Sequence, residues 1–343
     1  MADTAGSLPV RPRRQLPMRI TLRRKLEVLG ARGLTWVVRR ASRERALALA
    51  DDLALFGYRS PILKRHLKHA RIHVETVFGD QVSPAEREEL LKSSLRTLTR
   101  TMVDFMRFGD YTREEFLGLC AGVEGMEHYE AFRNSAHGSA IGLGIHIGSW
   151  EYAGGYMAHL GPMVAVGKAQ REGAITALAI SNREAVGIEH ILSSATGSRK
   201  LIETLKRKDK AYLGLLADQN GGRDGLWVPY FGTLASSVKG PGFLMRRYKV
   251  PAQLLVGVWE GDKYRVIIGP LFYGVETADF DRDVLLNTAR VQEEYAKMWL
   301  RFPEQVLWLH KRWKSQPDTL SPEEAAGRVL TTAEWERERV RFG

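Results

Sequence analysis

The sequence has almost no cysteine and no clear membrane-spanning run. Cys120 is the one cysteine among 343 residues, so no intrachain disulfide can form and an oxidising compartment is not indicated. Its apolar surroundings, at helical spacing from Phe116 and Leu119, favour a packing role over that of a nucleophile. Arginine interrupts residues 18–40 throughout, which argues against a signal peptide and against the ~20 apolar residues of a membrane span.

Acidic residues are scarce at the start of the chain. Residues 1–73 carry 17 basic and 5 acidic side chains, whereas the net charge of the whole chain is +11, so the remainder is almost neutral. A polyanion or an anionic membrane surface is the natural partner of such a basic arm. Residues 1–17 contain three prolines and no apolar periodicity, and we expect a disordered basic tail there.

Residues 18–130 are predicted to form an N-terminal helical, membrane-associating region. Residues 18–40 have an amphipathic pattern with one tryptophan, which suits either a helix in the bilayer interface or a helix packed on the protein's own core. Residues 43–57, 60–79 and 83–109 follow as helices, each closing at a glycine. The last begins with Ser83, three positions before Glu86, the pattern of a capping box.

Residues 131–343 are predicted to form an α/β core, a mixed and mostly parallel sheet covered by helices. Short apolar runs end at glycine or charge and alternate with helical stretches, the order of βαβ units. The strands are expected within residues 139–147, 161–167, 210–218 and 251–269. The last range holds Gly261 and Asp262 between two alternating runs, which indicates a hairpin.

The stretch HIGSWE, residues 146–151, places two ionisable side chains in this apolar setting. On one strand or one helix His146 and Glu151 would point apart, so they meet only if the chain turns between them. Gly148 and Ser149 provide that turn, as pivot and helix N-cap. A carboxylate on one imidazole nitrogen leaves the other free as a general base. The plain alternative is a buried histidine bonded to backbone and a glutamate that caps a helix.

Other charged residues accompany this stretch. Asp218 ends a second apolar run, and parallel strands carry their sites at their carboxyl ends, so His146 and Asp218 are expected to face one crevice. Arg183, after an apolar helical face, is placed to meet an anion or an oxyanion, or is simply a surface arginine. Lys239 and the neighbouring Arg246 and Arg247 are expected on a helix beginning near Ser236–Ser237, facing substrate phosphates or solvent.

The sequence resembles the lipid A late acyltransferase family, which is similar to the glycerolipid acyltransferases with their H-x₄-D/E dyad. The resemblance runs from about residue 134 to residue 314. It rests on four segments in order: HIGSWE, SNREAVG, ADQNGGRDGLWVPYFGTLASSVKGP and FPEQVLWLHKRWK.

This resemblance assigns roles to four residues. It implies that His146 is the general base, Glu151 its carboxylate partner, Arg183 an essential arginine, and Asp218 the aspartate of an Asp-Gln motif. Gln219, the second residue of that motif, is predicted with Lys239 to bind substrate. Neither a metal nor another cofactor is implied.

The resemblance also implies a reaction and a place. Acyl carrier protein donates a fatty acyl chain to a hydroxyl of a Kdo-bearing lipid A precursor, at the cytoplasmic face of the inner membrane. Family members commonly begin with a hydrophobic anchor, whereas this chain has an arginine-rich helix, so we expect peripheral or monotopic attachment to anionic lipid.

Two alternatives stay open at this stage. One is an acyltransferase that acts on a phospholipid or another glycolipid, with acyl-CoA or acyl carrier protein as donor. The other is a non-catalytic basic protein that binds nucleic acid or a membrane surface. Aromatic and basic residues alternate in WLHKRWK, as in grooves for single strands, but no recognised RNA- or DNA-binding motif accompanies them, so no nucleic-acid partner is predicted.

Overall fold

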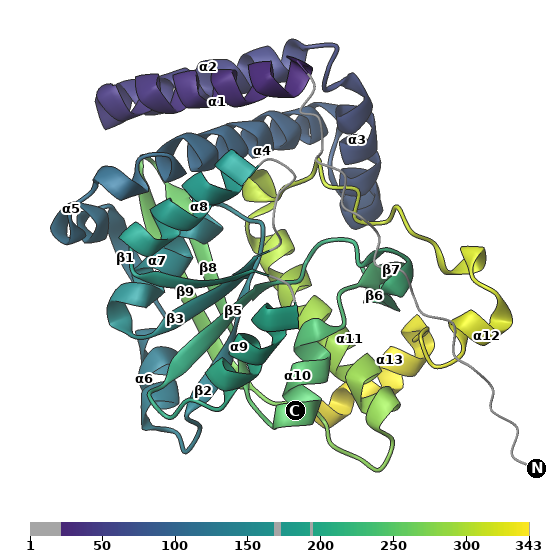
Figure 1. The fold of residues 1–343 in the computed structure, drawn as a ribbon. Coiled ribbons are helices and arrows are strands. Elements are labelled where there is room, and N and C mark those ends of the chain that lie inside the picture. Colours follow the sequence, from purple (N-terminus) through teal and green to yellow (C-terminus); the bar gives the residue numbers. More distant parts are fainter. Residues whose placement is uncertain (1–21, 168–172, 193–194, 343) are drawn as a thin grey trace, which may run out of the picture.

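A seven-stranded sheet with helices on both faces forms the centre of the computed structural model, which describes residues 22–167, 173–192 and 195–342 (Figure 1). The predicted α/β class is confirmed, and so is the N-terminal run of helices. The predicted tail over residues 1–17 lies outside the described residues. The division of the chain at residue 130 stays a prediction.

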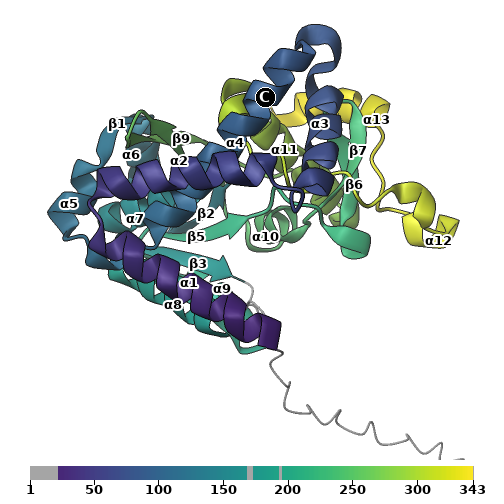
Figure 2. The same ribbon diagram turned by 90° about the horizontal axis from the view of Figure 1, so that it is seen from above.

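Four helices precede the sheet, close to their predicted positions. They are α1 (Leu22–Arg40), α2 (Arg43–Arg59), α3 (Lys64–Phe78) and α4 (Pro84–Phe105). The capping box is confirmed, because the Ser83 hydroxyl accepts from the Glu86 N–H while the Glu86 carboxylate accepts from the Ser83 N–H. Helix α2 packs on α4, and α1 lies beside α2 at the same end of the molecule (Figure 2).

A buried ion pair fastens these helices to the sheet. Asp104 of α4 is fully buried and binds Arg43 of α2, with an Nη2–Oδ2 distance of 2.9 Å. The Tyr264 hydroxyl donates to the same carboxylate over 2.6 Å. A paired and hydrogen-bonded carboxylate tolerates this burial, so the position of α4 relative to the sheet is well defined.

The sheet has the strand order β1-β9-β8-β2-β5-β3-β4. Its strands are β1 (Cys120–Glu124), β2 (Ser139–Gly144), β3 (Met163–Gly167), β4 (Ile188–Leu192), β5 (Ala211–Leu216), β8 (Ala252–Glu260) and β9 (Lys263–Phe272). Only the β8–β9 pair is antiparallel, and its turn at Gly261–Asp262 confirms the predicted hairpin. Cys120 was expected at helical spacing but begins strand β1, where it is half-buried in a hydrophobic cluster.

Helices and a small hairpin complete the fold. The helices are α5 (Arg113–Gly118), α6 (Met126–Asn134), α7 (Trp150–Leu160), α8 (Gly173–Ala185), α9 (Ala195–Leu205), α10 (Gly240–Tyr248), α11 (Phe280–Arg301), α12 (Pro322–Ala325) and α13 (Thr332–Glu338). The hairpin pairs β6 (Leu226–Tyr230) with β7 (Thr233–Ser237). A helix was expected from Ser236–Ser237, but both residues end β7 and α10 begins at Gly240.

Alternating side chains of the sheet divide the core into two clusters. Ile141 and Leu143 of β2 pack with residues of α3, α4 and α11, whereas Ala140 belongs to the cluster with α6 and α7. Both faces are therefore covered, as in other parallel sheets. Among the described residues, no helix has the length and apolar character needed to cross a bilayer.

Candidate active site

His146 lies in the loop between β2 and α7, two residues beyond the strand. The predicted turn is confirmed: Gly148 has φ +54°, and the Ser149 hydroxyl caps α7 by accepting from the Tyr152 N–H. A Cβ at position 148 would lie 2.2 Å from the carbonyl oxygen of Gly257. Both the conformation and this close approach require glycine, so the turn that presents His146 is set locally.

The carboxylate partner of His146 is Asp218. The imidazole Nδ1 lies 2.7 Å from Asp218 Oδ1, and the backbone N–H of His146 donates to Oδ2 over 3.0 Å. Strands β2 and β5 pair in parallel with a constant offset, Ser139 opposite Ala211 and Gly144 opposite Leu216. The same offset, continued past both strands, brings position 146 opposite position 218. The predicted closeness of His146 and Asp218 is observed, although Asp218 does not itself line the cavity described below.

The environment of this pair sets the protonation of His146. Burial lowers the pKa of His146, but the charge and hydrogen bond of Asp218, helped by the charge of Glu151, outweigh burial and raise it above 6.5. With Nδ1–H donating to Asp218, the neutral imidazole has its lone pair on Nε2. Nε2 lies 3.3 Å from Nε2 of Gln219, whose amide N–H is the donor in this tautomer. The neutral ring of His146 can therefore accept a proton at Nε2.

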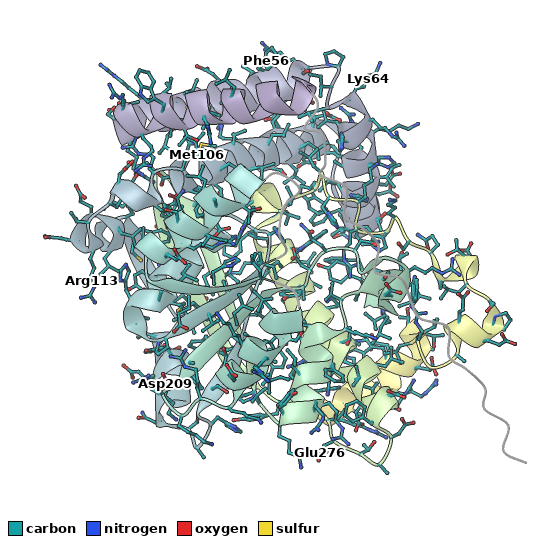
Figure 3. The ribbon with its side chains drawn as sticks, in the orientation of Figure 1. Phe56, Lys64, Met106, Arg113, Asp209 and Glu276 are labelled. Atoms are coloured by element: carbon teal, nitrogen blue, oxygen red, sulfur yellow. The ribbon has the colours of Figure 1, made fainter. Side chains whose placement is uncertain are left out.

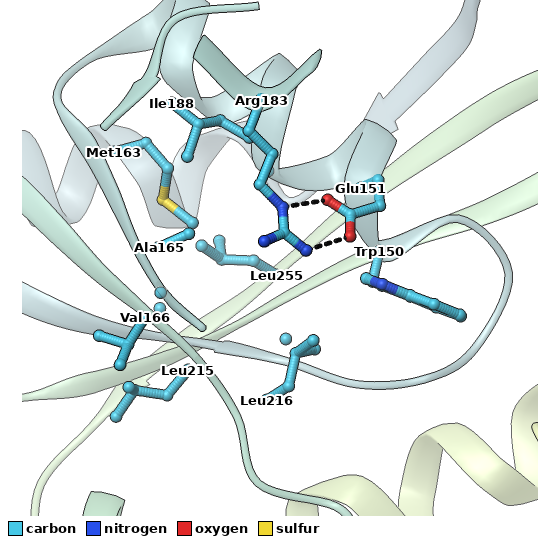
Figure 4. A pocket seen from close by; sticks show the side chains of 14 residues that line it. Trp150, Glu151, Met163, Ala165, Val166, Arg183, Ile188, Leu215, Leu216 and Leu255 are labelled. Atoms are coloured by element: carbon cyan, nitrogen blue, oxygen red, sulfur yellow. Dashed lines mark hydrogen bonds and ion pairs between the residues drawn. The ribbon is translucent and has the colours of Figure 1, made fainter. Parts of the chain in front are cut away.

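Glu151 does not bind His146, and the pairing expected between them is wrong. In the first turn of α7, its carboxylate accepts from Arg183 of α8 at both oxygens, with an Nε–Oε2 distance of 2.8 Å (Figure 4). Asp218, expected to face one crevice with His146, occupies the position beside the imidazole. The physical reason is strand pairing, because β5 brings Asp218 alongside the loop before α7 has begun.

The guanidinium of Arg183 is largely buried, with 19% of its side chain exposed. Burial lowers the pKa of Arg183, while the hydrogen bonds and charge of Glu151 raise it by more, so the net pKa is raised. Arg183 also contacts His190 of β4, with an Nη1–Nε2 distance of 3.0 Å. Sequence analysis missed His190, because strand β4 carries no pattern that marks its place beside α8.

These groups surround a cavity of about 490 Å³, within the usual size range of ligand pockets. His146, Gln219, Glu151, Arg183 and His190 all line it. The rest of the lining is mostly apolar and comes from α4, α8 and the strand ends: Met102, Phe105, Met106, Trp150, Val166, Gly167, Thr176, Leu178, Ala179, Ile180, Asn182 and Leu216. A cavity with a polar, titratable end and an apolar remainder suits a ligand that has one polar and one apolar part.

A second, smaller cavity of about 60 Å³ adjoins the first (Figure 4). Trp150, Glu151, Val166, Arg183 and Leu216 line both. Its floor contains glycines of neighbouring strands, and Gly142 of β2 lies opposite Gly214 of β5. A Cβ at position 214 would lie 2.5 Å from Met163 Cε, so the glycines leave room for apolar side chains to reach the sheet.

The segment after α11 supports the two loops that carry His146 and Gln219. The Leu307 N–H donates to the carbonyl of His146, and the Asn220 N–H donates to Nε2 of His310 over 2.9 Å. Burial lowers the pKa of His310 to about 4, so it accepts as a neutral ring. Arg312 is fully buried and donates to the Ser236 carbonyl, the Ser237 hydroxyl and the Gln292 side chain.

The structure does not bring Lys239 to the cavity. Lys239 is exposed at the start of α10 and lines neither cavity, so its part in substrate binding stays a prediction. Arg246 is committed to Asp283, with an Nε–Oδ2 distance of 2.6 Å, and Arg247 is exposed beside the Tyr248 ring. Within residues 22–167, 173–192 and 195–342, no group of three His, Cys, Asp or Glu side chains is arranged to hold a metal ion.

Comparisons with known proteins indicate the family of this chain. The family model described as bacterial lipid A biosynthesis acyltransferase matches residues 18–315. The chain is 25% identical over 261 residues to the lipid A biosynthesis palmitoleoyltransferase of Escherichia coli (strain K12), a match that covers 75% of this chain and 81% of that protein. The lipid A biosynthesis acyltransferase of Shigella flexneri matches with the same identity and coverage. The chain therefore belongs to the bacterial lipid A biosynthesis acyltransferase family.

Proposed function

We propose that this acyltransferase moves a fatty acyl chain from acyl carrier protein to a hydroxyl of a Kdo-bearing lipid A precursor, with His146 as general base. The observation that carries the proposal is the His146–Asp218 pair at the polar end of a mostly apolar cavity. Asp218 fixes the Nδ1–H tautomer, so Nε2 can take a proton from the acceptor hydroxyl. Gln219, which contacts Nε2, then gives way to that hydroxyl.

The chemical step breaks one bond to the acyl carbon and forms another. As His146 Nε2 takes the proton, the acceptor oxygen attacks the thioester carbonyl carbon and a tetrahedral oxyanion forms. When the oxyanion collapses, the C–S bond breaks and the thiolate takes the proton back from Nε2, which restores the neutral ring. The bound ester and the free thiol are the products.

Arg183 is proposed to stabilise the oxyanion. Its guanidinium lines the same cavity as His146, and Glu151 and His190 accept three of its five N–H groups. The other two have no recorded acceptor among the described residues. Donors held in place before the reaction stabilise developing charge without a cost of reorganisation. Glu151 is accordingly a positioning residue for Arg183.

The apolar part of the cavity is proposed to hold the acyl chain. Its lining by methionine, phenylalanine and leucine side chains matches a hydrocarbon in polarity. The smaller cavity over Gly142 and Gly214 shares Trp150 and Arg183 with the first and is also lined by Met163. Methionine adapts its shape readily, so this end is suited to chains that differ by a few carbons.

The N-terminal helices are proposed to attach the protein peripherally to the cytoplasmic face of the inner membrane. Leu29 and Trp36 of α1 and Phe56 of α2 are more than half exposed, and so is Ile62 just after α2. Phe56 and Lys64 point away from the body of the protein at this end (Figure 3). Large apolar side chains among basic residues favour the interface of an anionic bilayer, where the glycolipid acceptor resides. The same positive charge attracts an acidic carrier protein.

The test offers donors and acceptors in parallel. Purified wild-type protein is incubated with lauroyl, myristoyl and palmitoleoyl carrier proteins and their coenzyme A counterparts. The palmitoleoyl donor is included because of the name of the Escherichia coli relative. A Kdo-bearing lipid A precursor and a lysophospholipid serve as acceptors. We expect transfer from carrier protein to the lipid A precursor; transfer to the lysophospholipid alone would refute the proposed acceptor and favour the phospholipid alternative.

A further inference from the structure

We propose that His190 is a positioning residue for this acyl transfer: it holds the guanidinium of Arg183 in place, and Gly167 leaves the space in which it does so. The inference rests on the proposed function, since it assigns Arg183 to the reacting carbonyl.

Arg183 is held from two directions. Glu151 of α7 accepts from Nε and Nη2, and His190 of β4 lies 3.0 Å from Nη1. A guanidinium has donors only and keeps its proton, so Nε2 of His190 must be the acceptor in this contact. The ring proton is then on Nδ1 and the ring is neutral. Burial, followed by the charge of Arg183, lowers the pKa of His190 in keeping with that state.

The contact with His190 holds a part of the guanidinium that the contact with Glu151 leaves without a partner. The bidentate carboxylate of Glu151 binds Nε and Nη2 and leaves Nη1 without a partner from α7. An acceptor on Nη1, from a strand of the sheet, holds this other side of the guanidinium as well. The remaining N–H groups of Arg183 are thereby aimed at a constant place in the cavity that Arg183, Glu151 and His190 line together. Such fixed donors are what a developing oxyanion requires.

Gly167, the last residue of β3, gives independent support. A Cβ built at position 167 would lie 2.7 Å from His190 Nε2 and 3.5 Å from Arg183 Nη1. Its φ is not in the left-handed region, so the backbone accepts alanine there without strain. An alanine at this position would therefore disturb the imidazole–guanidinium contact first, since atoms of His190 and Arg183 are the nearest to its Cβ. Glycine at position 167 thus leaves room for the imidazole of His190 to contact the guanidinium of Arg183.

The test is a double-mutant cycle on acyl transfer. We expect His190→Ala to lower kcat/KM roughly 10–100-fold, the usual effect of losing a supporting partner of a reactive group. His190→Gln keeps an acceptor, Oε1, near the position of Nε2 and should recover most of the activity. Gly167→Ala should lower kcat/KM about tenfold in the wild type but cause no further loss in His190→Ala, because the ring it displaces is gone. Gly118→Ala is the matched control, since a Cβ there meets nothing within 4 Å.

Several results would overturn the inference. They are wild-type kcat/KM in His190→Ala, equal damage in His190→Gln and His190→Ala, or a full additional loss from Gly167→Ala in the double variant. If the wild-type protein transfers no acyl group to any acceptor, the proposed function fails, and ¹⁵N NMR of the imidazole rings tests the contact separately. We expect His190 protonated on Nδ1 alone, with a shift of its Nε2 resonance in Gly167→Ala. Protonation on Nε2 would refute the contact.

Discussion

Asp218 and Glu151 are buried to almost the same degree beside one cavity, yet they hold cations of different kinds. Asp218, at the end of a strand, holds an imidazole that gains and loses a proton near neutral pH. Glu151, at the start of a helix, holds a guanidinium that stays charged. The strand side of the cavity can therefore move a proton, and the helix side supplies a fixed charge. Because their partners differ, substitutions of Asp218 and of Glu151 should have different effects.

The largest effect is expected from His146→Ala. General-base catalysis contributes roughly 10²–10⁴-fold, so kcat should fall by about three orders of magnitude while the protein stays folded. Rates of acyl transfer and the circular dichroism spectrum are the measurements. His66→Ala, on the exposed face of α3, is the matched control and should transfer normally. Transfer by His146→Ala at more than a tenth of the wild-type rate would contradict the proposed role.

The two carboxylates should also differ in their contribution to stability. Glu151→Ala leaves the buried charge of Arg183 without its carboxylate, which typically costs about 3–5 kcal/mol of unfolding free energy. Asp218→Ala should cost only about 1–3 kcal/mol, because His146 can lose its proton instead of staying charged. Urea denaturation measures both, with Glu184→Ala as an exposed control on α8. Equal losses of unfolding free energy in Glu151→Ala and Asp218→Ala would contradict the expected difference between the two carboxylates.

The stability difference depends on pH in a defined direction. The pKa of His146 is raised in the folded protein, so its contribution is fully present below its unfolded pKa of 6.5 and is lost as the pH rises through the folded value. The pKa of Asp218 is lowered, so its contribution is present above its unfolded pKa of 3.8 and is lost as the pH falls further. The cost of Asp218→Ala should therefore be greatest between these limits.

The smallest effect is expected outside the cavity, at the N-terminal helices. Removing two exposed aromatic side chains with Trp36→Ser and Phe56→Ser should weaken binding to anionic vesicles by roughly tenfold or more, because each side chain, partly buried in the interface, contributes a part of the about 1.5–3 kcal/mol of a fully buried one. Cosedimentation with vesicles of anionic and of neutral lipid measures it. Val340→Ser, equally exposed near the other end of the chain, is the control. Unchanged binding would refute this attachment surface.

Local patterns in the sequence were sufficient for the turn that presents His146. Gly148 and Ser149 act through their own conformation and capping, so neighbours in sequence determine them. The helices and most strands followed from apolar periodicity in the same way. The β6–β7 hairpin was missed because its turn places Phe231 at φ +53°, beside Gly232. Phenylalanine is not a residue type that indicates such a turn.

The partners of the site residues could not be predicted, because strand order decides them. β5 lies beside β2 in the sheet although β3 and β4 intervene in the sequence. That order pairs Asp218 with His146 and leaves Glu151 to Arg183. His190 and Gly167 meet for the same reason, as β3 and β4 are neighbours with α8 between them in sequence. A short H-x₄-E pattern describes two residues that share a cavity and says nothing of which cation each one holds.

An NMR titration of the His146 ring in wild type, Asp218→Asn and Glu151→Gln measures directly which carboxylate the imidazole depends on. We expect a wild-type pKa of His146 above 6.5, a large fall in Asp218→Asn to below that value, since burial then outweighs the remaining charge of Glu151, and only a small fall in Glu151→Gln. A larger fall in Glu151→Gln than in Asp218→Asn would contradict this expectation.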